Sequence, residues 1–253
     1  MTDVKSTLLT RRAAVRILSS VTATPWLITA PAGVGSTPVR SSSAVSGETK
    51  TPATTFPLDT PDGWEVVGGK AEAATYRGRK AVRLAPVPEH QDSDDAILAI
   101  LAPGFKDGTI EAEIAGFPRP GVSPDERGFV GIAFRVQPHG SRYECFYLRP
   151  TNGRADDQLR RNHSTQYVSE PDYPWHRLRQ ESPGVYESYA DMEAGAWTKI
   201  TIAVVGVKAQ LYVNGADQPA LIVNDLKLGE SSGQIALWAH WTTDAHFSNL
   251  TIR

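Results

Sequence analysis

Apolar side chains occupy every second position in a series of short runs along most of this chain. In one run Ile110, Ala112 and Ile114 alternate with the carboxylates of Glu111 and Glu113. Because successive side chains of a β-strand point to opposite faces, this pattern indicates a strand with one buried face. Comparable alternation occurs in residues 128–136, 199–205, 208–213, 234–240 and 246–252. The chain is therefore expected to fold mainly as β-strands.

Turn residues divide these runs at short intervals. Gly206 separates the run 199–205 from the run 208–213, and Asn214-Gly215 follows the second of them. Asn-Gly tolerates the positive backbone angles of a tight turn, so the two runs predict a hairpin. Helical periodicity is absent after the N-terminal segment. We therefore predict an all-β sandwich of two antiparallel sheets packed face to face.

The composition fits one large soluble domain. Of 253 residues, 40% are hydrophobic and 21% are charged, which is enough for a substantial core. Six Trp and eight Tyr outnumber two Met, which suits a β-protein that uses amphipathic rings in its core and at a ligand surface. The net charge of -2 gives no reason to expect a nucleic-acid partner.

The single cysteine, Cys145, excludes an intramolecular disulfide. It lies in an apolar run between Tyr143 and Leu148. We expect it to be a small buried residue rather than a nucleophile, because it lies in a predicted strand among Tyr and Phe residues.

The N-terminal segment differs in character from the rest. Arg11-Arg12 precedes a modestly apolar run, 13–30, and Ala30-Pro31-Ala32 offers small residues at a cleavage-like spacing. We interpret residues 1–32 as a twin-arginine export signal, which would lead to a periplasmic or extracellular location. A disordered basic tail is the alternative. Because Arg16 and several hydroxyl residues interrupt the run, we expect no stable membrane span.

Residues 33–55 are rich in Ser, Thr, Pro and Gly and have little periodicity. This composition predicts a disordered linker. The folded domain is then expected to comprise residues 56–253.

The order of the predicted strands resembles the concanavalin A-like lectin/glucanase jelly roll, of which laminin G-like domains are one branch. The likeness is clearest in residues 197–215, where a Trp, two strands and an Asn-Gly turn follow one another. Within that superfamily the chain is most similar to the 3-keto-disaccharide hydrolase domain family, through residues 131–135 (GIAFR), 143–144 (YE), 233–240 (GQIALWAH) and 247–252 (FSNLTI). The resemblance covers roughly residues 60–253 and implies a jelly-roll domain.

The resemblance also implies three catalytic residues, Arg135, Glu144 and His240, each at the end or on the open face of a strand. The arginine would hold a sugar carbonyl or hydroxyl pair, and the carboxylate and imidazole would move the proton next to a ketone. The alternative is an Arg135–Glu144 ion pair with a surface histidine. A shift of one residue in strand register would turn Glu144 inward.

An ordinary retaining glucanase is disfavoured. Jelly-roll glucanases carry a Glu-x-Asp-x-x-Glu run or a close variant, and the chain has none. Glu111 and Glu113 share a face, but neighbouring carboxylates on a strand are commonly solvated.

The segment from Tyr143 to Tyr189 is crowded with Arg, His, Tyr and Trp. A connection this long in a compact domain carries function or is disordered, and its aromatic content argues against disorder. Aromatic faces stack on sugars, and Arg, Asn and Gln donate to sugar hydroxyls. We expect the substrate-binding residues to be Arg149, Asn162, His163, Gln166, Tyr167, Trp175 and Arg179, together with Trp238. A protein-facing surface, or no ligand, is the alternative.

Metal ligands are weakly indicated, and we assign none. His240 and His246 lie on either side of Asp244 and of a predicted turn, where antiparallel strands would bring the two rings together. Calcium on loop oxygens is the other alternative, so a divalent metal, calcium or a transition metal, stays open as a cofactor.

These observations predict an exported domain that binds a carbohydrate or glycoside on the concave face of one sheet. Cleavage of a 3-keto-glycoside is the activity that the resemblance implies. A non-catalytic laminin G-like or lectin-like module that binds carbohydrate or protein is the alternative. An enzyme would need Arg135, Glu144 and His240 to converge on one cleft, and a lectin would not.

Overall fold

The computed structural model describes residues 53–90 and 96–253. The predicted export signal (1–32) and the predicted linker up to residue 52 lie outside the described residues. Strand β1 (Thr54–Phe56) pairs with a strand near the C-terminus, so the sheet begins before residue 56, where we expected the domain to start. Within the described part of the chain, no helix has the length and apolar character needed to cross a membrane.

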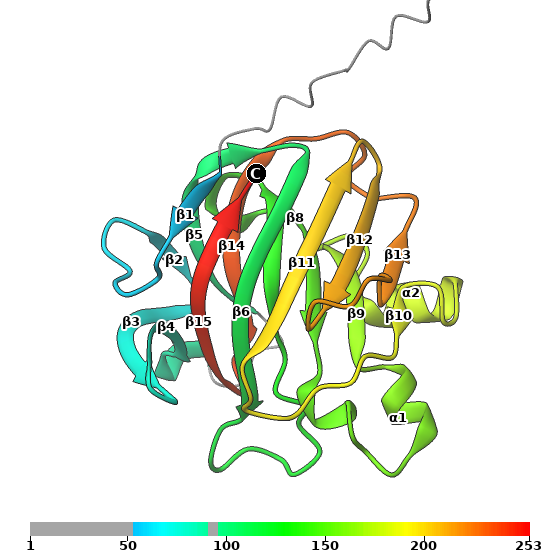
Figure 1. Cartoon of the computed structure of the whole chain (residues 1–253), viewed down its shortest axis with the longest axis horizontal. Coiled ribbons are helices and arrows are strands. Elements are labelled where there is room, and N and C mark those ends of the chain that lie inside the picture. The colour runs from blue at the N-terminus through cyan, green and yellow to red at the C-terminus, as the bar shows by residue number, and fades with distance from the viewer. Residues whose placement is uncertain (1–52, 91–95) are drawn as a thin grey trace, which may run out of the picture. The chain divides into compact units, whose positions relative to one another are not determined.

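The strands form two antiparallel sheets, which we call sheet A and sheet B. In the described residues sheet A has eight strands, and it lies on the near side of Figure 1. Strand β1 pairs with β15 beside the main order, which is β13 (Leu221–Val223), β12 (Lys208–Val213), β11 (Thr198–Val205), β6 (Gly108–Pro118), β15 (Thr243–Ile252), β4 (Arg79–Pro86) and β3 (Gly69–Tyr76).

Sheet B lies behind sheet A in Figure 1 and has seven strands within the described ranges. Together the two sheets confirm the predicted all-β jelly-roll sandwich. The order of strands in sheet B is β10 (Glu187–Ser188), β9 (Thr165–Glu170), β8 (Tyr143–Leu148), β7 (Val130–Val136), β14 (Gly233–His240), β5 (Ala96–Phe105) and β2 (Glu65–Val67).

The core lies between the sheets because the alternating apolar residues turn inward. Strand β6 pairs with β11 so that Ile110 lies opposite Ile202 and Ala112 lies opposite Ile200. All four side chains are buried. Burying one such isoleucine contributes about 1.5–3 kcal/mol relative to leaving it exposed. The alternation read from the sequence therefore assigns this part of the core correctly.

The predicted hairpin is confirmed as β11–β12. Its strands pair from Ile200 opposite Val213 to Val205 opposite Lys208. Gly206 in the turn has a φ of 58°, in the left-handed region that glycine adopts without steric cost. Asn214 also has a positive φ, as expected for the turn that follows β12.

Strands β7 and β8 are buried on both faces, so burial alone does not show which face of sheet B points toward sheet A. The backbone N–H groups of Lys227 and Leu228, which follow β13 of sheet A, donate to Tyr167 and Glu144. The face that carries Tyr167 and Glu144 is therefore the inner one. The opposite face, which we call the outer face of sheet B, carries Tyr143, Cys145, Tyr147, Gln166, Val168, Glu170, Glu187, Trp238 and His240.

We expected the segment from Tyr143 to Tyr189 to be one long connection, but it is built of regular elements. It contains β8, α1 (Gln158–Asn162), β9, α2 (Trp175–Glu181) and β10. Helix α1 begins at Asp157, whose side chain accepts a hydrogen bond from Arg160 N at 2.7 Å. Helix α2 packs against β9 and buries Leu178. Elsewhere in the described residues the helices are the short 3-10 segments η1 (Pro88–His90), η2 (Pro138–Gly140) and η3 (Pro150–Asn152).

Candidate functional site

One row of neighbouring residues crosses the outer face of sheet B. In strand pairing Trp238 lies opposite Gly131, Gly131 opposite Tyr147, Tyr147 opposite Gln166, and Gln166 opposite Glu187. The rings of Tyr147 and Trp238 stack with centroids 4.7 Å apart. A Cβ at Gly131 would lie only 2.6 Å from Tyr147 Cβ, so glycine is required between the two strands.

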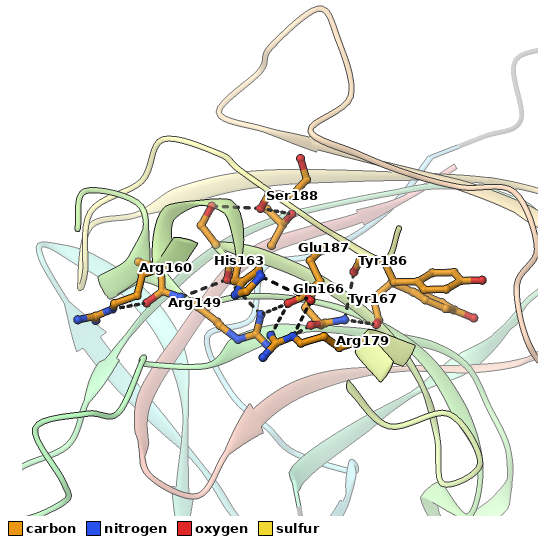
Figure 2. A network of polar contacts seen from close by, with 12 residues as sticks. Arg149, Arg160, His163, Gln166, Tyr167, Arg179, Tyr186, Glu187 and Ser188 are labelled. Atoms are coloured by element: carbon orange, nitrogen blue, oxygen red, sulfur yellow. Dashed lines mark hydrogen bonds and ion pairs between the residues drawn. The ribbon is translucent and has the colours of Figure 1, made fainter. Parts of the chain in front are cut away.

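Arg149 extends this row beyond the end of β8, and Figure 2 shows its guanidinium at the centre of the polar network. Its Nη2 donates to Tyr147 Oη and to Gln166 Oε1, each at 3.0 Å. Its Nη1 donates to the His163 carbonyl at 3.1 Å and to Glu187 Oε2 at 3.3 Å. One buried arginine thereby joins β8, the end of α1, β9 and β10.

Glu187 is the buried acid of the network, with 2% of its side chain exposed. Arg179 of α2 donates to both carboxylate oxygens, at 2.7 and 2.5 Å, as Figure 2 shows. Burial raises the pKa of Glu187, but the hydrogen bonds from Arg179 and the charges of Arg149 and Arg179 together leave this pKa below its ordinary value. Glu187 is therefore a carboxylate at neutral pH.

His163 lies beside that carboxylate, with Nε2 3.8 Å from Glu187 Oε1 and 22% of its side chain exposed. Its position is determined by its own carbonyl, which accepts hydrogen bonds from Arg149 Nη1 and from Asn152 Nδ2. Burial lowers the pKa of His163. The charge of Glu187 raises this pKa, and the charges of Arg179 and Arg149 lower it, so the pKa stays below its ordinary value. The imidazole is thus neutral at neutral pH and able to accept a proton.

The structure places Arg135, for which a catalytic role was predicted, away from this site. Its side chain is 0% exposed. The guanidinium donates to the carbonyls of Lys106, Gly206 and Gly229, and to Asp107 Oδ1 at 3.2 Å. The register between β7 and β14 shifts by a β-bulge, and Arg135 has a φ of 53° there. This bulge turns the side chain away from the outer face.

Glu144 and Tyr167 also lie away from this site, because their side chains are on the inner face and not on the open face that we predicted. Glu144 is fully buried and accepts hydrogen bonds from Tyr167 Oη at 2.5 Å and from Leu228 N at 2.7 Å. Burial raises the pKa of Glu144 and of Tyr167. Glu144 therefore points inward, as a one-residue shift in register would place it, and the alternative of an Arg135–Glu144 ion pair is not observed.

His240 lies on the outer face of sheet B at the end of β14, apart from Arg135 and Glu144. Its Nδ1 is 2.8 Å from Thr242 Oγ1, and its ring packs edge-on against Phe129. The three predicted catalytic residues therefore do not converge on one cleft.

The residues predicted to bind substrate fall into two groups. Arg149, His163, Gln166 and Arg179 meet around Glu187, and Trp238 lies in the same row of sheet B. Asn162 is exposed on α1 and bonded to Gln158, and Trp175 is 44% exposed on α2 with the Arg179 guanidinium over its ring. These two and Tyr167 take no part in the contacts around Glu187.

Sequence reasoning missed Glu187 and Tyr147. Tyr147 was hidden in a run with apolar residues on both faces, so alternation did not distinguish its outward direction. Glu187 belongs to a strand of two residues, which is too short to produce a periodic signal. The buried charge of Glu187 can be recognised only once Arg149 and Arg179 are known to lie beside it.

The predicted approach of His240 and His246 is wrong, because β14 and β15 belong to different sheets. His246 lies in sheet A, where its Nε2 is 3.1 Å from Asp244 Oδ1 and its ring stacks on Tyr76. Within residues 53–90 and 96–253, no group of three His, Cys, Asp or Glu side chains is arranged to hold a metal ion.

Comparison with known proteins supports the fold and identifies the family. The carbohydrate-binding module CBM66 from Bacillus subtilis superposes with a TM-score of 0.50 at 15% identity, over 76% of this chain and 96% of its own. A protein of unknown function with a galectin-like fold, also from Bacillus subtilis, gives 0.51 at 12% identity, over 79% and 94%. No curated protein sequence matches the chain. The model of the 3-keto-alpha-glucoside-1,2-lyase-like domain matches residues 54–253, and the chain therefore belongs to that family.

Proposed function

We propose that this protein cleaves 3-keto-glucosides by elimination at the outer face of sheet B. The observation that carries the proposal is the neutral imidazole of His163 beside the buried Glu187 carboxylate, which Arg149 and Arg179 also hold. The family to which the chain belongs supports the reaction type. A base with a lowered pKa next to an oriented carboxylate is an arrangement suited to proton transfer at neutral pH.

The chemistry follows from the ketone at C3, which acidifies the hydrogen on C2. His163 takes that proton at Nδ1, the ring nitrogen other than the one beside Glu187, the C2–H electrons form the C1=C2 double bond, and the C1–O bond breaks. The protonated imidazole then returns the proton to the departing oxygen. One glycoside thereby gives a conjugated enone sugar and an alcohol, with no oxidant or reductant consumed.

The other residues have defined roles in this scheme. Glu187 stabilises the imidazolium that forms on His163, as a carboxylate does beside a catalytic histidine. Arg179 directs Nε and Nη2 to Glu187 and is partly exposed, which leaves Nη1 to donate to the C3 oxygen as negative charge develops there. Both terminal nitrogens of Arg149 donate to protein groups, and Arg149 acts by orienting Glu187 and the His163 carbonyl.

The test uses the full chain with methyl 3-keto-α-glucoside and the unoxidised methyl α-glucoside. We expect enone absorbance to appear only with the keto sugar, and deuterium at C2 to slow its appearance. His163→Ala should lower kcat by about a hundredfold or more, whereas His176→Ala, at an exposed position on α2, should leave kcat unchanged. Full activity in His163→Ala would rule out His163 as the base.

Glycoside binding without cleavage is the second candidate. It is favoured by the complete pairing of Glu187 and by the limited exposure of His163. Saturable binding of either sugar by calorimetry, with no enone formed by the wild type, would support this candidate over the lyase.

We also propose export by a twin-arginine signal, on the strength of Arg11-Arg12 and the apolar run after them. Replacing both arginines by lysine should retain the precursor in the cytoplasm, as measured by fractionation and immunoblotting. Unchanged amounts of protein outside the cytoplasm would contradict the signal.

A further inference from the structure

A second acidic residue, Glu170, lies on the outer face of sheet B away from the polar network. It is the last residue of β9 and shares its face with Gln166, because these positions are an even number of residues apart on one strand. In the pairing with β8 it lies opposite Tyr143, whose hydroxyl accepts a hydrogen bond from Trp238 Nε1.

Glu170 differs from the buried acids Glu144 and Glu187 in having no partner among the residues that the structure describes. Glu144 accepts two hydrogen bonds, and Glu187 is held by Arg149 and Arg179. The Glu170 carboxyl group makes neither a hydrogen bond nor an ion pair with any described residue, although it is partly buried. Burial raises its pKa. Desolvating a carboxyl group without compensation costs free energy, so this position is not explained by stability.

Glu170 adds negative charge near two side chains of the outer face. Burial raises the pKa of Tyr147 to about 12, Arg149 opposes this, and the charges of Glu187 and Glu170 add to it. Glu170 also contributes to the raised pKa of Cys145, after burial. Glu170 alternates with the inner-face residue Ser169 on β9, so its side chain lies on the outer face together with Tyr147 and Cys145.

We infer that Glu170 recognises the leaving group of a bound glycoside by hydrogen bonds between its carboxyl group and hydroxyls of a second sugar ring. The inference rests on the proposed function, in which the keto ring lies beside His163. Glu170 and Gln166 are separated along β9 by about 13 Å, which is comparable to the length of a disaccharide. The partial exposure of Glu170 leaves it accessible to a ligand. Glu170 would then determine specificity without taking part in proton transfer at C2.

The experiment compares Glu170→Ala and Glu170→Gln with the wild type on two substrates. One is a disaccharide with a 3-keto-α-glucosyl unit, and the other is methyl 3-keto-α-glucoside, which has no second ring. In Glu170→Ala the KM for the disaccharide should rise about tenfold or more, while kcat and KM for the methyl glycoside stay unchanged. Glu170→Gln should show a smaller rise. Glu181→Gln, at an exposed glutamate of α2, is the matched control.

Equal losses on both substrates, or no loss on either, would overturn the inference. Thermal unfolding provides a second reading, because removing an unpartnered carboxylate should leave Glu170→Gln at least as stable as the wild type. A clear loss of stability would identify a structural role instead.

The inference can fail separately from the lyase proposal. If the wild type cleaves neither keto sugar, the lyase proposal fails, and calorimetry with the unoxidised disaccharide then tests Glu170 alone. Weaker disaccharide binding by Glu170→Ala, with methyl α-glucoside binding unchanged, would support the inference. Unchanged disaccharide binding, or no binding by the wild type, would overturn it.

Discussion

Two arginines, Arg135 and Arg149, are buried in sheet B, and their surroundings differ in a way that separates structure from function. Arg135 donates mainly to backbone carbonyls, those of Lys106, Gly206 and Gly229. Arg149 donates mainly to side chains that can themselves do chemistry or bind a ligand. Backbone carbonyls neither titrate nor react under these conditions. The contacts of Arg135 therefore serve to hold loops together.

The comparison teaches that burial of a charged residue does not by itself indicate a functional site. Both guanidinium groups are almost fully removed from solvent. What distinguishes them is whether the partners include an acid and a base with shifted pKa values, as Glu187 and His163 have. Three experiments would break or sharpen this distinction.

The largest effect is expected for Arg135→Met. Removing the guanidinium leaves buried carbonyls without donors, and the free energy of unfolding should fall by about 3–5 kcal/mol. Urea denaturation would measure this. Arg142→Met, at an exposed arginine that directly precedes β8, should change stability by only about 0.5 kcal/mol. A stable Arg135→Met variant with impaired turnover would reverse the assignment of the two regions.

An intermediate effect is expected for Glu144→Gln on the inner face. The substituted amide would place a donor against groups that already donate, so unfolding should become easier by about 1–3 kcal/mol. Turnover per folded molecule should be unchanged, as judged from kcat after correction for the folded fraction. A selective loss of kcat with normal stability would restore the catalytic role first predicted from the sequence.

The smallest effect is a difference in pH dependence between the two regions. Because the pKa of Glu187 is lowered in the folded protein, its carboxylate stabilises the fold at pH values above the ordinary glutamate pKa, near 4.5. This stabilisation is lost as the pH falls through the pKa of the folded state. The lowered pKa of His163 also makes the folded protein less stable as the pH falls below about 6.5, because the unfolded chain binds the proton more readily. Carbonyl oxygens do not titrate in this range, so the contacts of Arg135 with them should be insensitive to pH.

Melting temperatures between pH 7 and pH 4 would test this difference. Stability should fall on acidification, and Glu187→Gln should show a shallower fall than the wild type. An equally steep fall in the variant would mean that other groups carry the acid sensitivity.

The sequence predicted what depends on local alternation. Strands such as 199–205 and 208–213, with their turn, follow from a period of two residues and a Gly or Asn-Gly signal. The outward direction of Arg135 was predicted wrongly because a bulge adds one residue to the strand and no local signal reports it. Glu144 was predicted wrongly because both faces of β8 are buried, which removes the polar marker of the outer face.

The candidate site was predicted only in part. Arg149, His163, Gln166 and Arg179 were selected for their chemical types, but their convergence depends on β8, α1, β9, α2 and β10 coming together. The acid that unites them, Glu187, carried no signal of its own in a strand of two residues. Long-range contacts of this kind cannot be read from spacing along the chain.

The arrangement around Arg135 also has a consequence for the order of folding events. Its carbonyl partners lie 29, 71 and 94 residues away along the chain. Closing a loop of this length costs conformational entropy of the chain before the contact at its ends can form. Such loops are therefore expected to close late in folding. The guanidinium should therefore be unsatisfied in the transition state and engaged only in the native state. Arg135→Met should then speed unfolding far more than it slows refolding, giving a φ-value near zero in stopped-flow kinetics.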